Sequence, residues 1–356
     1  MKFTFRWFGD KFDTITPEQI RQIPAVVGVI TTLYDTMPGE VWEVDAIKAL
    51  KARAERAGLE ISGIESVNIH DAIKAATPER DMYIENYITT LSRLGEEGIN
   101  LVCYNFMPVF DWTRSDLAKL RPDGSTVLSY DADIVENMNF EQMLESLGSK
   151  SEGFLLPGWE PERMARNKEL FEIYKGIDEV KLRENLGYFL RAIMPVCEKY
   201  GIKMAIHPDD PAWSVFGLPR IVKNHDDLHA LVNLVPGPCN GVTLCTGSLG
   251  SDPGNDIPAI IRSLKGKIHF AHVRNVKYLG YRKFDEAAHL SEDGSLDMYE
   301  IMKAFYDIGF TGAVRPDHGR MVWGEKSMPG YGLYDRAMGI CYLSGLLEAV
   351  RKGTPT

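Results

Sequence analysis

Cysteine is scarce in this chain of 356 residues, which has only five, scattered singly and never arranged as Cys-X-X-Cys. An odd, scattered set does not make a disulfide framework, so we expect a reducing, cytoplasmic setting. Long apolar runs are lacking too. No run reaches the length that spans a bilayer, and the first residues, Met1 to Trp7, have no apolar signal core. We therefore expect no membrane partner.

Positively charged residues are also fewer than negatively charged ones. The chain has 40 lysines and arginines against 50 aspartates and glutamates, a formal net charge of −10 at pH 7. This balance, without basic clusters interleaved with aromatics, argues against a nucleic-acid partner. The sequence also lacks the Gly-rich dinucleotide and phosphate loops and the Gly-X-Ser-X-Gly nucleophile motif. The net charge does not exclude a small anionic substrate, because a pocket on an acidic protein can be locally positive.

What the sequence does contain is a regular alternation of apolar runs and amphipathic stretches. Eight runs predict strands, at residues 3–8, 26–33, 59–67, 99–104, 203–207, 241–245, 268–273 and 312–315. Helical spacing is found at residues 44–57, 79–97, 179–200, 225–235, 255–264, 297–308 and 335–351. Strands and helices in this order predict an α/β fold, a (β/α)8 TIM barrel that forms one domain over residues 1–356.

The alternation breaks between residues 105 and 178. This segment opens with aromatics and proline, has a turn at Asp123-Gly124, and continues with helical stretches near 132–147 and 160–176. A structureless loop of this length is uncommon in a compact domain. We therefore predict a helical insertion after the fourth strand, which serves as a lid or as an oligomer contact. A homodimer is the expected assembly.

Four strand ends in the second half of the chain carry metal-binding residue types: His207, Cys245, His272 and Asp317. In a barrel these ends converge on one mouth. Two imidazoles, a thiolate and a carboxylate can bind a divalent transition metal. Each residue alone has an ordinary explanation, such as a buried cysteine, a packed histidine or a turn aspartate. Their joint placement favours a metal site.

Polar residues next to these strand ends fit a pocket for a sugar acid. Arg274 and Arg315 are candidates for binding a carboxylate, and His318 is a candidate for moving a proton. Further candidate substrate-binding residues are Arg6, Trp7, Ser66, His70, Asn105, Asp209, Ser248 and His289. Packing remains an alternative role for Trp7, as do loop and turn roles for His70, Asp209 and Ser248.

Longer motifs run from the first strand to the closing helix. They are Arg6-Trp7-Phe8-Gly9, Glu65-Ser66-Val67-Asn68-Ile69-His70, Val102 to Pro108, Asp111-Trp112-Thr113-Arg114, His207-Pro208-Asp209-Asp210-Pro211, Leu244 to Ser248, Glu286-Ala287-Ala288-His289-Leu290, Arg315-Pro316-Asp317-His318-Gly319 and Pro329-Gly330-Tyr331. In combination they resemble the mannonate dehydratases of the xylose-isomerase-like barrel superfamily, over nearly the whole chain.

The resemblance implies dehydration of D-mannonate to 2-keto-3-deoxy-D-gluconate, in hexuronate breakdown. It also implies a divalent metal on the four strand-end residues named above. A cysteine ligand favours Mn2+, Fe2+ or Co2+ over Mg2+, because thiolate is soft, and we expect Mn2+ first. For this reaction we assign His318 as the base that takes the C2 proton. Tyr331, at a Pro-Gly turn, is assigned as the acid that helps the C3 hydroxyl leave, and the reverse assignment stays open.

Three other functions are compatible with a barrel of this kind. A metal-dependent sugar isomerase or epimerase would use the same metal, but paired arginines favour an acid substrate. A catalytically inactive sugar-acid-binding barrel would not need both a base and an acid. A metal-dependent DNA-repair nuclease would need a basic groove, which the net charge disfavours.

Overall fold

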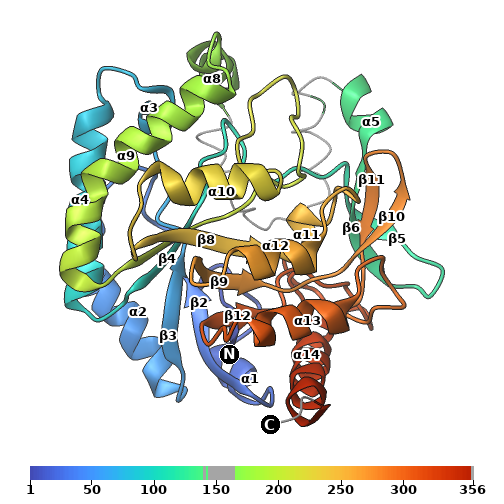
Figure 1. Cartoon of the computed structure of the whole chain (residues 1–356). Coiled ribbons are helices and arrows are strands. Elements are labelled where there is room, and N and C mark those ends of the chain that lie inside the picture. The colour runs from blue at the N-terminus through green and yellow to red at the C-terminus, as the bar shows by residue number, and fades with distance from the viewer. Residues whose placement is uncertain (139–141, 143–164, 354–356) are drawn as a thin grey trace.

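Eight parallel strands form a closed barrel in the computed structural model, which describes residues 1–138, 142 and 165–353 (Figure 1). The strands are β1 (Lys2–Arg6), β2 (Val26–Thr31), β3 (Glu60–Glu65), β4 (Leu101–Tyr104), β7 (Lys203–Ile206), β8 (Asn240–Cys245), β9 (Ile268–His272) and β12 (Ala313–Arg315). They follow one another around the barrel in chain order, and β12 pairs with β1 to close it. The predicted (β/α)8 barrel is therefore confirmed, and each strand lies within a few residues of its predicted position.

The register of the last strands places polar residues in one row at the carboxyl rim of the barrel. Cys245 at the end of β8 is paired with His272 at the end of β9, and His272 is paired with Arg315 at the end of β12. Neighbouring strands lie about 4.8 Å apart. Three chemically active side chains from distant parts of the chain are therefore brought to adjacent positions at one mouth.

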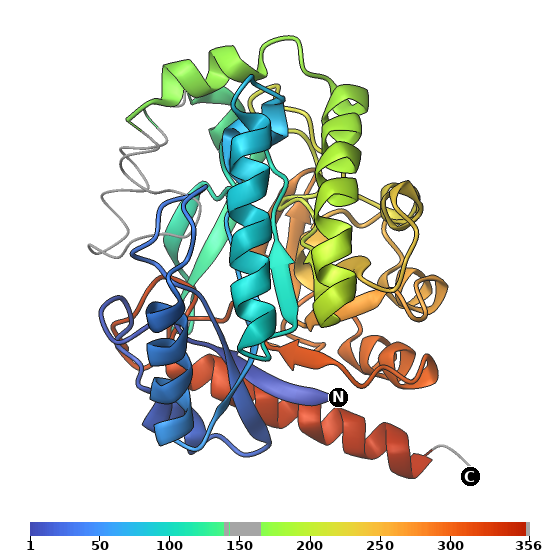
Figure 2. The ribbon, with the colours of Figure 1, turned by 90° about the vertical axis from the view of Figure 1, so that its left-hand side faces the viewer.

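Helices cover the outer face of the barrel. They are α1 (Pro17–Arg21), α2 (Val44–Arg56), α3 (Asp71–Ala75), α4 (Arg80–Glu96), α9 (Glu179–Tyr200), α10 (His225–Leu234), α11 (Thr246–Leu249), α12 (Ile257–Ser263), α13 (Met298–Asp307) and α14 (Leu333–Gly353). The α4 and α9 helices lie side by side (Figure 2). The ends of α9 follow its sequence, since Asp178 caps its first turn and Gly201, with a φ of 67°, ends it. Buried apolar side chains from helices and strands together form the core.

The insertion between β4 and β7 begins with strands. β5 (Asp116–Leu120) and β6 (Thr126–Asp131) form a hairpin. β6 also pairs antiparallel with β11 (Lys283–Glu286), which pairs with β10 (Val276–Gly280). This four-stranded sheet, which we call the accessory sheet, joins the insertion to the segment after β9 and lies beside the barrel (Figure 1).

The prediction of a helical insertion is therefore incomplete. The short helices α5 (Ala132–Asn137) and α8 (Asn167–Tyr174) lie in the two stretches where helices were predicted. Half of the predicted helix at 132–147 and the beginning of that at 160–176 lie outside the described residues. The accessory sheet was not predicted, because its strands are short and half of its pairing partners come from about 150 residues further along the chain.

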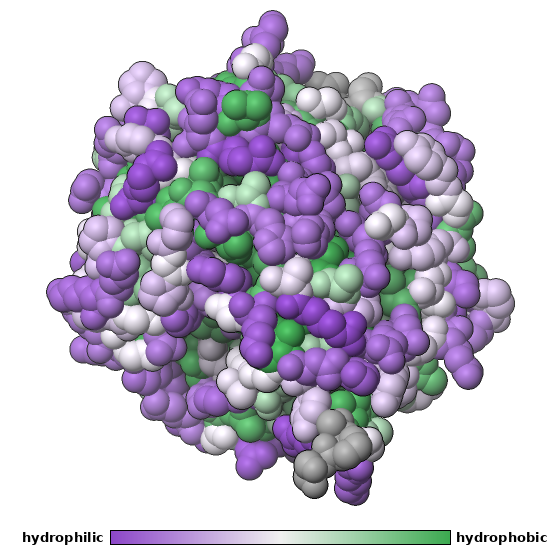
Figure 3. All heavy atoms as spheres, in the orientation of Figure 1, coloured by the Kyte–Doolittle hydropathy of each residue, from purple (hydrophilic) through white to green (hydrophobic). Residues whose placement is uncertain are grey.

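The molecular face in Figure 3 is mainly hydrophilic, with apolar side chains scattered among the polar ones. Within the described ranges, no helix combines the length and the apolar character needed to cross a membrane.

Candidate active site

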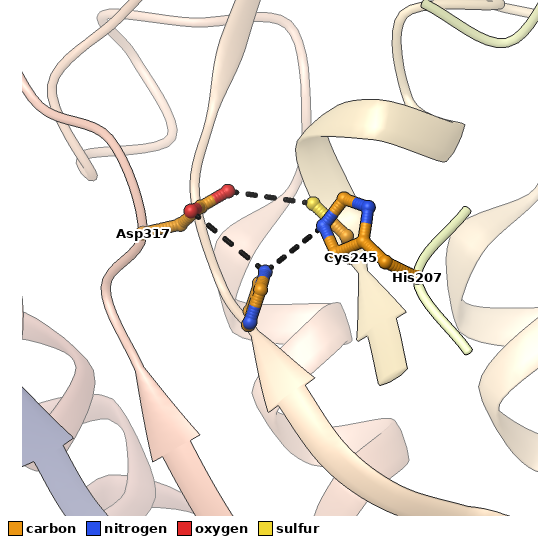
Figure 4. Close-up of side chains that lie close together, drawn as sticks. His207, Cys245 and Asp317 are labelled. Atoms are coloured by element: carbon orange, nitrogen blue, oxygen red, sulfur yellow. Dashed lines mark hydrogen bonds and ion pairs between the residues drawn. The ribbon is translucent and has the colours of Figure 1, made fainter. Parts of the chain in front are cut away.

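Side chains from four strand ends meet at the carboxyl mouth of the barrel. His207 directly follows β7, Cys245 and His272 end β8 and β9, and Asp317 lies two residues beyond β12. Their ligand atoms all lie within 4.8 Å of one another. Nε2 of His207 is 3.1 Å from Nδ1 of His272, and Sγ of Cys245 is 3.5 Å from Oδ2 of Asp317. Figure 4 shows His207, Cys245 and Asp317 pointing toward one another. The four predicted ligands thus come together as a candidate metal centre.

Local structure aims the thiol and the carboxylate at this centre. Cys245 caps the first turn of α11, where its Sγ accepts hydrogen bonds from the amide and the hydroxyl of Ser248 at 3.4 and 3.0 Å. Asp317 has a φ of 61°, a left-handed conformation that costs a non-glycine residue on the order of 1 to 3 kcal/mol and is common at functional sites. Two imidazoles, a thiol and a carboxylate, clustered this closely, fit a divalent transition metal.

Two buried arginines hold the carboxylate of Asp317. Arg274 donates from Nε to Oδ2 at 2.7 Å, and Nη1 of Arg315 lies 2.7 Å from Oδ1. Burial alone would raise the pKa of Asp317, but the charge of Arg315, with smaller contributions from its other cationic neighbours, holds that pKa well below its ordinary value. Asp317 is therefore a carboxylate anion, the form that binds metals.

A buried network of two arginines and two carboxylates contacts the candidate metal centre through Asp317. Arg274 donates to Glu286 at 2.5 and 2.7 Å and to Asp210 at 2.7 Å. Arg114 donates to the same carboxylates, at 2.6 Å to Glu286 and at 2.8 and 3.1 Å to Asp210. Burial alone would raise the pKa of Glu286, but Arg274 and Arg114 lower it to about 2. The two positive charges of the arginines balance the two negative charges of the carboxylates, and the hydrogen bonds among them hold the four side chains in place.

The predicted base and acid are hydrogen-bonded to each other. Nε2 of His318 lies 2.9 Å from the phenolic oxygen of Tyr331, and Nδ1 of His318 lies 3.1 Å from Oε1 of Glu286. Burial raises the pKa of Tyr331 above its ordinary value, so the phenol keeps its proton. The predicted base and the predicted acid thus lie side by side at the mouth of the barrel.

A pocket includes two of the candidate metal ligands, His207 and Asp317, and Arg6 and Arg315 also line it. Nη2 of Arg6 donates to the Tyr34 hydroxyl at 2.6 Å. Nη1 of Arg6 is buried and has no hydrogen-bond acceptor among the described residues, although Oε2 of Glu65 lies 3.4 Å away. Arg315 already donates to both oxygens of Glu65, at 2.9 and 2.7 Å. The two guanidinium groups therefore share Glu65, Arg315 also contacts Asp317, and Arg6 keeps one donor without a hydrogen-bond acceptor at the pocket wall.

Half of the predicted site residues face this pocket. The substrate-binding candidates that line it are Arg6, Ser66, Asn105 and Arg315, and His207, Asp317, His318 and Tyr331 line it as well. Cys245 and His272 are fully buried next to them.

Three other candidates do not line the pocket. Arg274 is fully buried, and each of its three guanidinium nitrogens is hydrogen-bonded, to Asp317, Glu286, Asp210 or Ser248. It therefore has no nitrogen left without a partner for a substrate carboxylate. Trp7 is packed in the core. His70 accepts a hydrogen bond at the start of α3, and its ring stacks on another aromatic ring at 3.7 Å.

The remaining candidates also support the site from within. Asp209 accepts from the Val222 amide at 2.7 Å, whereas its neighbour Asp210 is the one that lines the pocket. Ser248 bonds the Cys245 sulfur. Nε2 of His289 lies 2.7 Å from the Pro316 carbonyl oxygen, and burial lowers the pKa of its imidazole, so it stays neutral.

Two site residues were missed from the sequence, Tyr34 and Glu286. Tyr34 follows β2 by three residues, so the strand-end argument that found Arg6 and Asn105 could have found it. Glu286 begins the motif from which only His289 was chosen. Its role depends on β11, a strand that was not predicted.

A family model described as D-mannonate dehydratase (UxuA) matches residues 1–355. This chain belongs to the D-mannonate dehydratase family. The mannonate dehydratase of Brachyspira hyodysenteriae is 68% identical to it over 352 residues, which cover 99% of both chains. That of Enterococcus faecalis is 55% identical over 351 residues, which cover 99% of this chain and 98% of the other. By family the chain is a hydro-lyase, a mannonate dehydratase.

A comparison with solved structures supports the same family assignment. The crystal structure of mannonate dehydratase from Streptococcus suis serotype 2 has a TM-score of 0.90 and 43% identity, covering 100% of this chain and 97% of that one. D-psicose 3-epimerase from Clostridium cellulolyticum is only 15% identical, with a TM-score of 0.55 over 99% of this chain and 97% of that one. This second likeness concerns the barrel fold alone.

Proposed function

We propose that this chain converts D-mannonate to 2-keto-3-deoxy-D-gluconate and water in the breakdown of hexuronates. The reaction needs a base for the C2 proton, an acid for the C3 hydroxyl and positive charge near the substrate carboxylate. The observation that carries the proposal is the hydrogen-bonded pair of His318 and Tyr331, which lines the same pocket as two arginines and two of the four clustered metal-ligand candidates.

The proposed cofactor is Mn2+, held by His207, Cys245, His272 and Asp317, with Fe2+ or Co2+ as alternatives. The support is the donor set itself, because a thiolate disfavours a hard ion such as Mg2+. When bound, the ion supplies positive charge that stabilises negative charge developing on substrate oxygens.

In the proposed proton path, Nε2 of His318 takes the C2 proton and Tyr331 gives its phenolic proton to the departing C3 hydroxyl. The C2–H and C3–O bonds break, water leaves, and the resulting enol rearranges to the 2-keto acid. The hydrogen bond of 2.9 Å between the two side chains then lets His318 return its proton to Tyr331. Both residues recover their starting states without help from solvent.

We propose that Arg6 and Arg315, and not Arg274, bind the substrate carboxylate. Arg6 has a buried donor without an acceptor among the described residues, and both arginines line the pocket. Charge-assisted pairs of this kind favour a carboxylate over a neutral sugar. Ser66 and Asn105, which line the same pocket, are the proposed partners of substrate hydroxyls.

The insertion at residues 105–178 is proposed to help enclose the substrate within a single barrel domain. Asn105, Met107, Asp111 and Trp112, from its first part, line the pocket. The homodimer remains a prediction, which light scattering of the purified protein can test.

The test is formation of 2-keto-3-deoxygluconate from D-mannonate by metal-stripped protein, with and without added Mn2+. We expect turnover only with the metal, and none in His318→Ala. The matched control is His225→Ala, an exposed histidine on α10, which should turn over as wild type does. Absence of product from the Mn2+-loaded wild type would refute the proposed reaction. Normal turnover by His318→Ala would refute only the role of that residue.

A further inference from the structure

The accessory sheet brings one carboxylate to the proposed catalytic base. Glu286 is the last residue of β11, and β11 is paired with β6 through Ser129, Tyr130 and Asp131. Oε1 of Glu286 lies 3.1 Å from Nδ1 of His318. We propose that Glu286 is a positioning residue that fixes the His318 imidazole in the tautomer with its proton on Nδ1. This inference rests on the proposed function, in which His318 is the base.

The direction of the hydrogen bonds follows from the chemistry of the three groups. An ionised carboxylate can only accept a hydrogen bond, so Nδ1 of His318 must be the donor toward Glu286. A neutral imidazole carries one proton, so Nε2 is then a lone-pair acceptor. The Tyr331 hydroxyl, 2.9 Å away, donates to that lone pair. In the tautomer with the proton on Nδ1, Nε2 therefore carries a lone pair, which takes the C2 proton once the Tyr331 hydroxyl turns from Nε2 to the departing C3 hydroxyl.

Glu286 is suited to this task because it cannot turn away or lose its charge easily. Its carboxylate also accepts three hydrogen bonds from Arg114 and Arg274, at 2.5 to 2.7 Å. The side chain of Glu286 is only 1% exposed. Asp317 is the other carboxylate near the ring, but its Oδ1 lies 3.8 Å from Nε2, beyond hydrogen-bonding distance.

Asp210 provides a matched control. It accepts from the same two arginines as Glu286, at 2.7 to 3.1 Å, but no hydrogen bond joins it to His318 in the described part of the chain. Replacing either carboxylate with alanine disturbs the arginines, and only Glu286→Ala removes the acceptor from Nδ1. A comparison of the two variants separates tautomer control from support of the network.

The tautomer can be read directly by two-bond 1H–15N correlation spectra of full-length protein labelled with 15N-histidine and loaded with diamagnetic Zn2+. The chain has eight histidines, and the signals of His318 are those lost in His318→Asn. The spectra are recorded at about pH 8.5, roughly two units above the ordinary imidazole pKa. Steady-state kinetics with D-mannonate and Mn2+ accompany them.

We expect His318 to be protonated on Nδ1 in the wild type and in Asp210→Ala, and to shift toward Nε2 protonation in Glu286→Ala. For Glu286→Ala we expect kcat to fall by about 10² to 10⁴-fold, the range seen when a carboxylate that orients a histidine is removed. The KM should change by only a few fold. If Glu286→Ala does not fold, Glu286→Asp keeps the charge but falls short of Nδ1, and it should shift the tautomer in the same direction.

Two results would overturn the inference. One is a wild-type His318 that is protonated on Nε2. The other is an unchanged tautomer in the Glu286 variant, since the carboxylate would then only hold the arginines. Neither result affects the dehydratase assignment, which depends on wild-type turnover of D-mannonate.

Discussion

The absence of a side chain at Gly247 allows Arg274 to pack closely beside the candidate metal centre, so Gly247→Ala tests this arrangement. A Cβ added at Gly247 would lie 2.5 Å from Cγ of Arg274 and 2.6 Å from both Nε and Cζ. Ordinary contacts of a Cβ begin at 3.4 Å, so Arg274 would have to move by about 0.9 Å. The guanidinium group cannot move this far without breaking hydrogen bonds, because each of its three nitrogens is hydrogen-bonded.

A displacement of about 0.9 Å directed away from Asp317 would lengthen the 2.7 Å hydrogen bond from Arg274 to Asp317 to roughly 3.6 Å, at which it is lost. The bonds to Asp210 and Ser248 are exposed to the same movement. Breaking a buried charged network of this kind costs about 3 to 5 kcal/mol. Loss of a residue that orients a metal ligand typically weakens metal binding by about 10 to 100-fold. We expect both effects in Gly247→Ala.

Urea denaturation of the metal-free protein would measure the first effect, and titration with Mn2+ the second. The control is Gly345→Ala in α14, where an added Cβ meets nothing within 4 Å. Since alanine is a better helix former than glycine, Gly345→Ala should be stabilised by about 0.5 to 1 kcal/mol and bind metal normally. Wild-type stability and metal affinity in Gly247→Ala would show that Arg274 does not position Asp317 as described.

Four further outcomes follow from the site. Tyr331→Phe should lower kcat by about 10² to 10⁴-fold with little change in KM, because it removes the acid alone; a normal kcat would exclude Tyr331 as the acid. Arg6→Met should reduce kcat/KM for D-mannonate by about 10 to 100-fold, as expected for a lost charge-assisted hydrogen bond of roughly 1.5 to 3 kcal/mol. An equal reduction of kcat/KM for the neutral amide of mannonate would argue against binding of the carboxylate by Arg6. Chelation should abolish turnover and added Mn2+ restore it, whereas full activity of a verified metal-free protein would contradict a metal role. Finally, Glu286 stabilises the metal-free fold above its unfolded pKa of 4.5, and this contribution is lost as the pH falls through its folded pKa of about 2. Acid unfolding of Glu286→Ala should therefore depend less on pH in this window, and an identical profile would count against the lowered pKa.

The barrel was predictable because its strands leave a strong pattern in the sequence. A strand such as β4 or β8 is buried along its whole length, since helices cover one side and packed side chains fill the other. It therefore reads as a short apolar run between amphipathic helices. The four metal-site candidates were found by the same logic, because each stands at or just beyond the end of such a run.

The accessory sheet left no comparable pattern. β5 alternates between buried, half-buried and exposed positions and carries lysine and aspartate, and β11 has only four residues. Its pairing with β6 depends on the way the barrel brings residues 129–131 and 283–285 together. A prediction from local propensity cannot contain this information, so Glu286 remained unassigned.

The arginines show where residue type and strand position stop being informative. Arg274 lies two residues beyond the end of β9 and Arg315 is the last residue of β12, and nothing in the sequence separated their roles. The structure separates them by position: Arg274 is enclosed by its acceptors away from the pocket, whereas Arg315 lines the pocket although it also contacts carboxylates. The decisive partners, Glu286 and Asp210, come from an unpredicted strand and from the loop after β7. Whether an arginine binds substrate or holds other site residues in place thus depends on the charged groups around it, and these are set by tertiary contacts between distant parts of the chain.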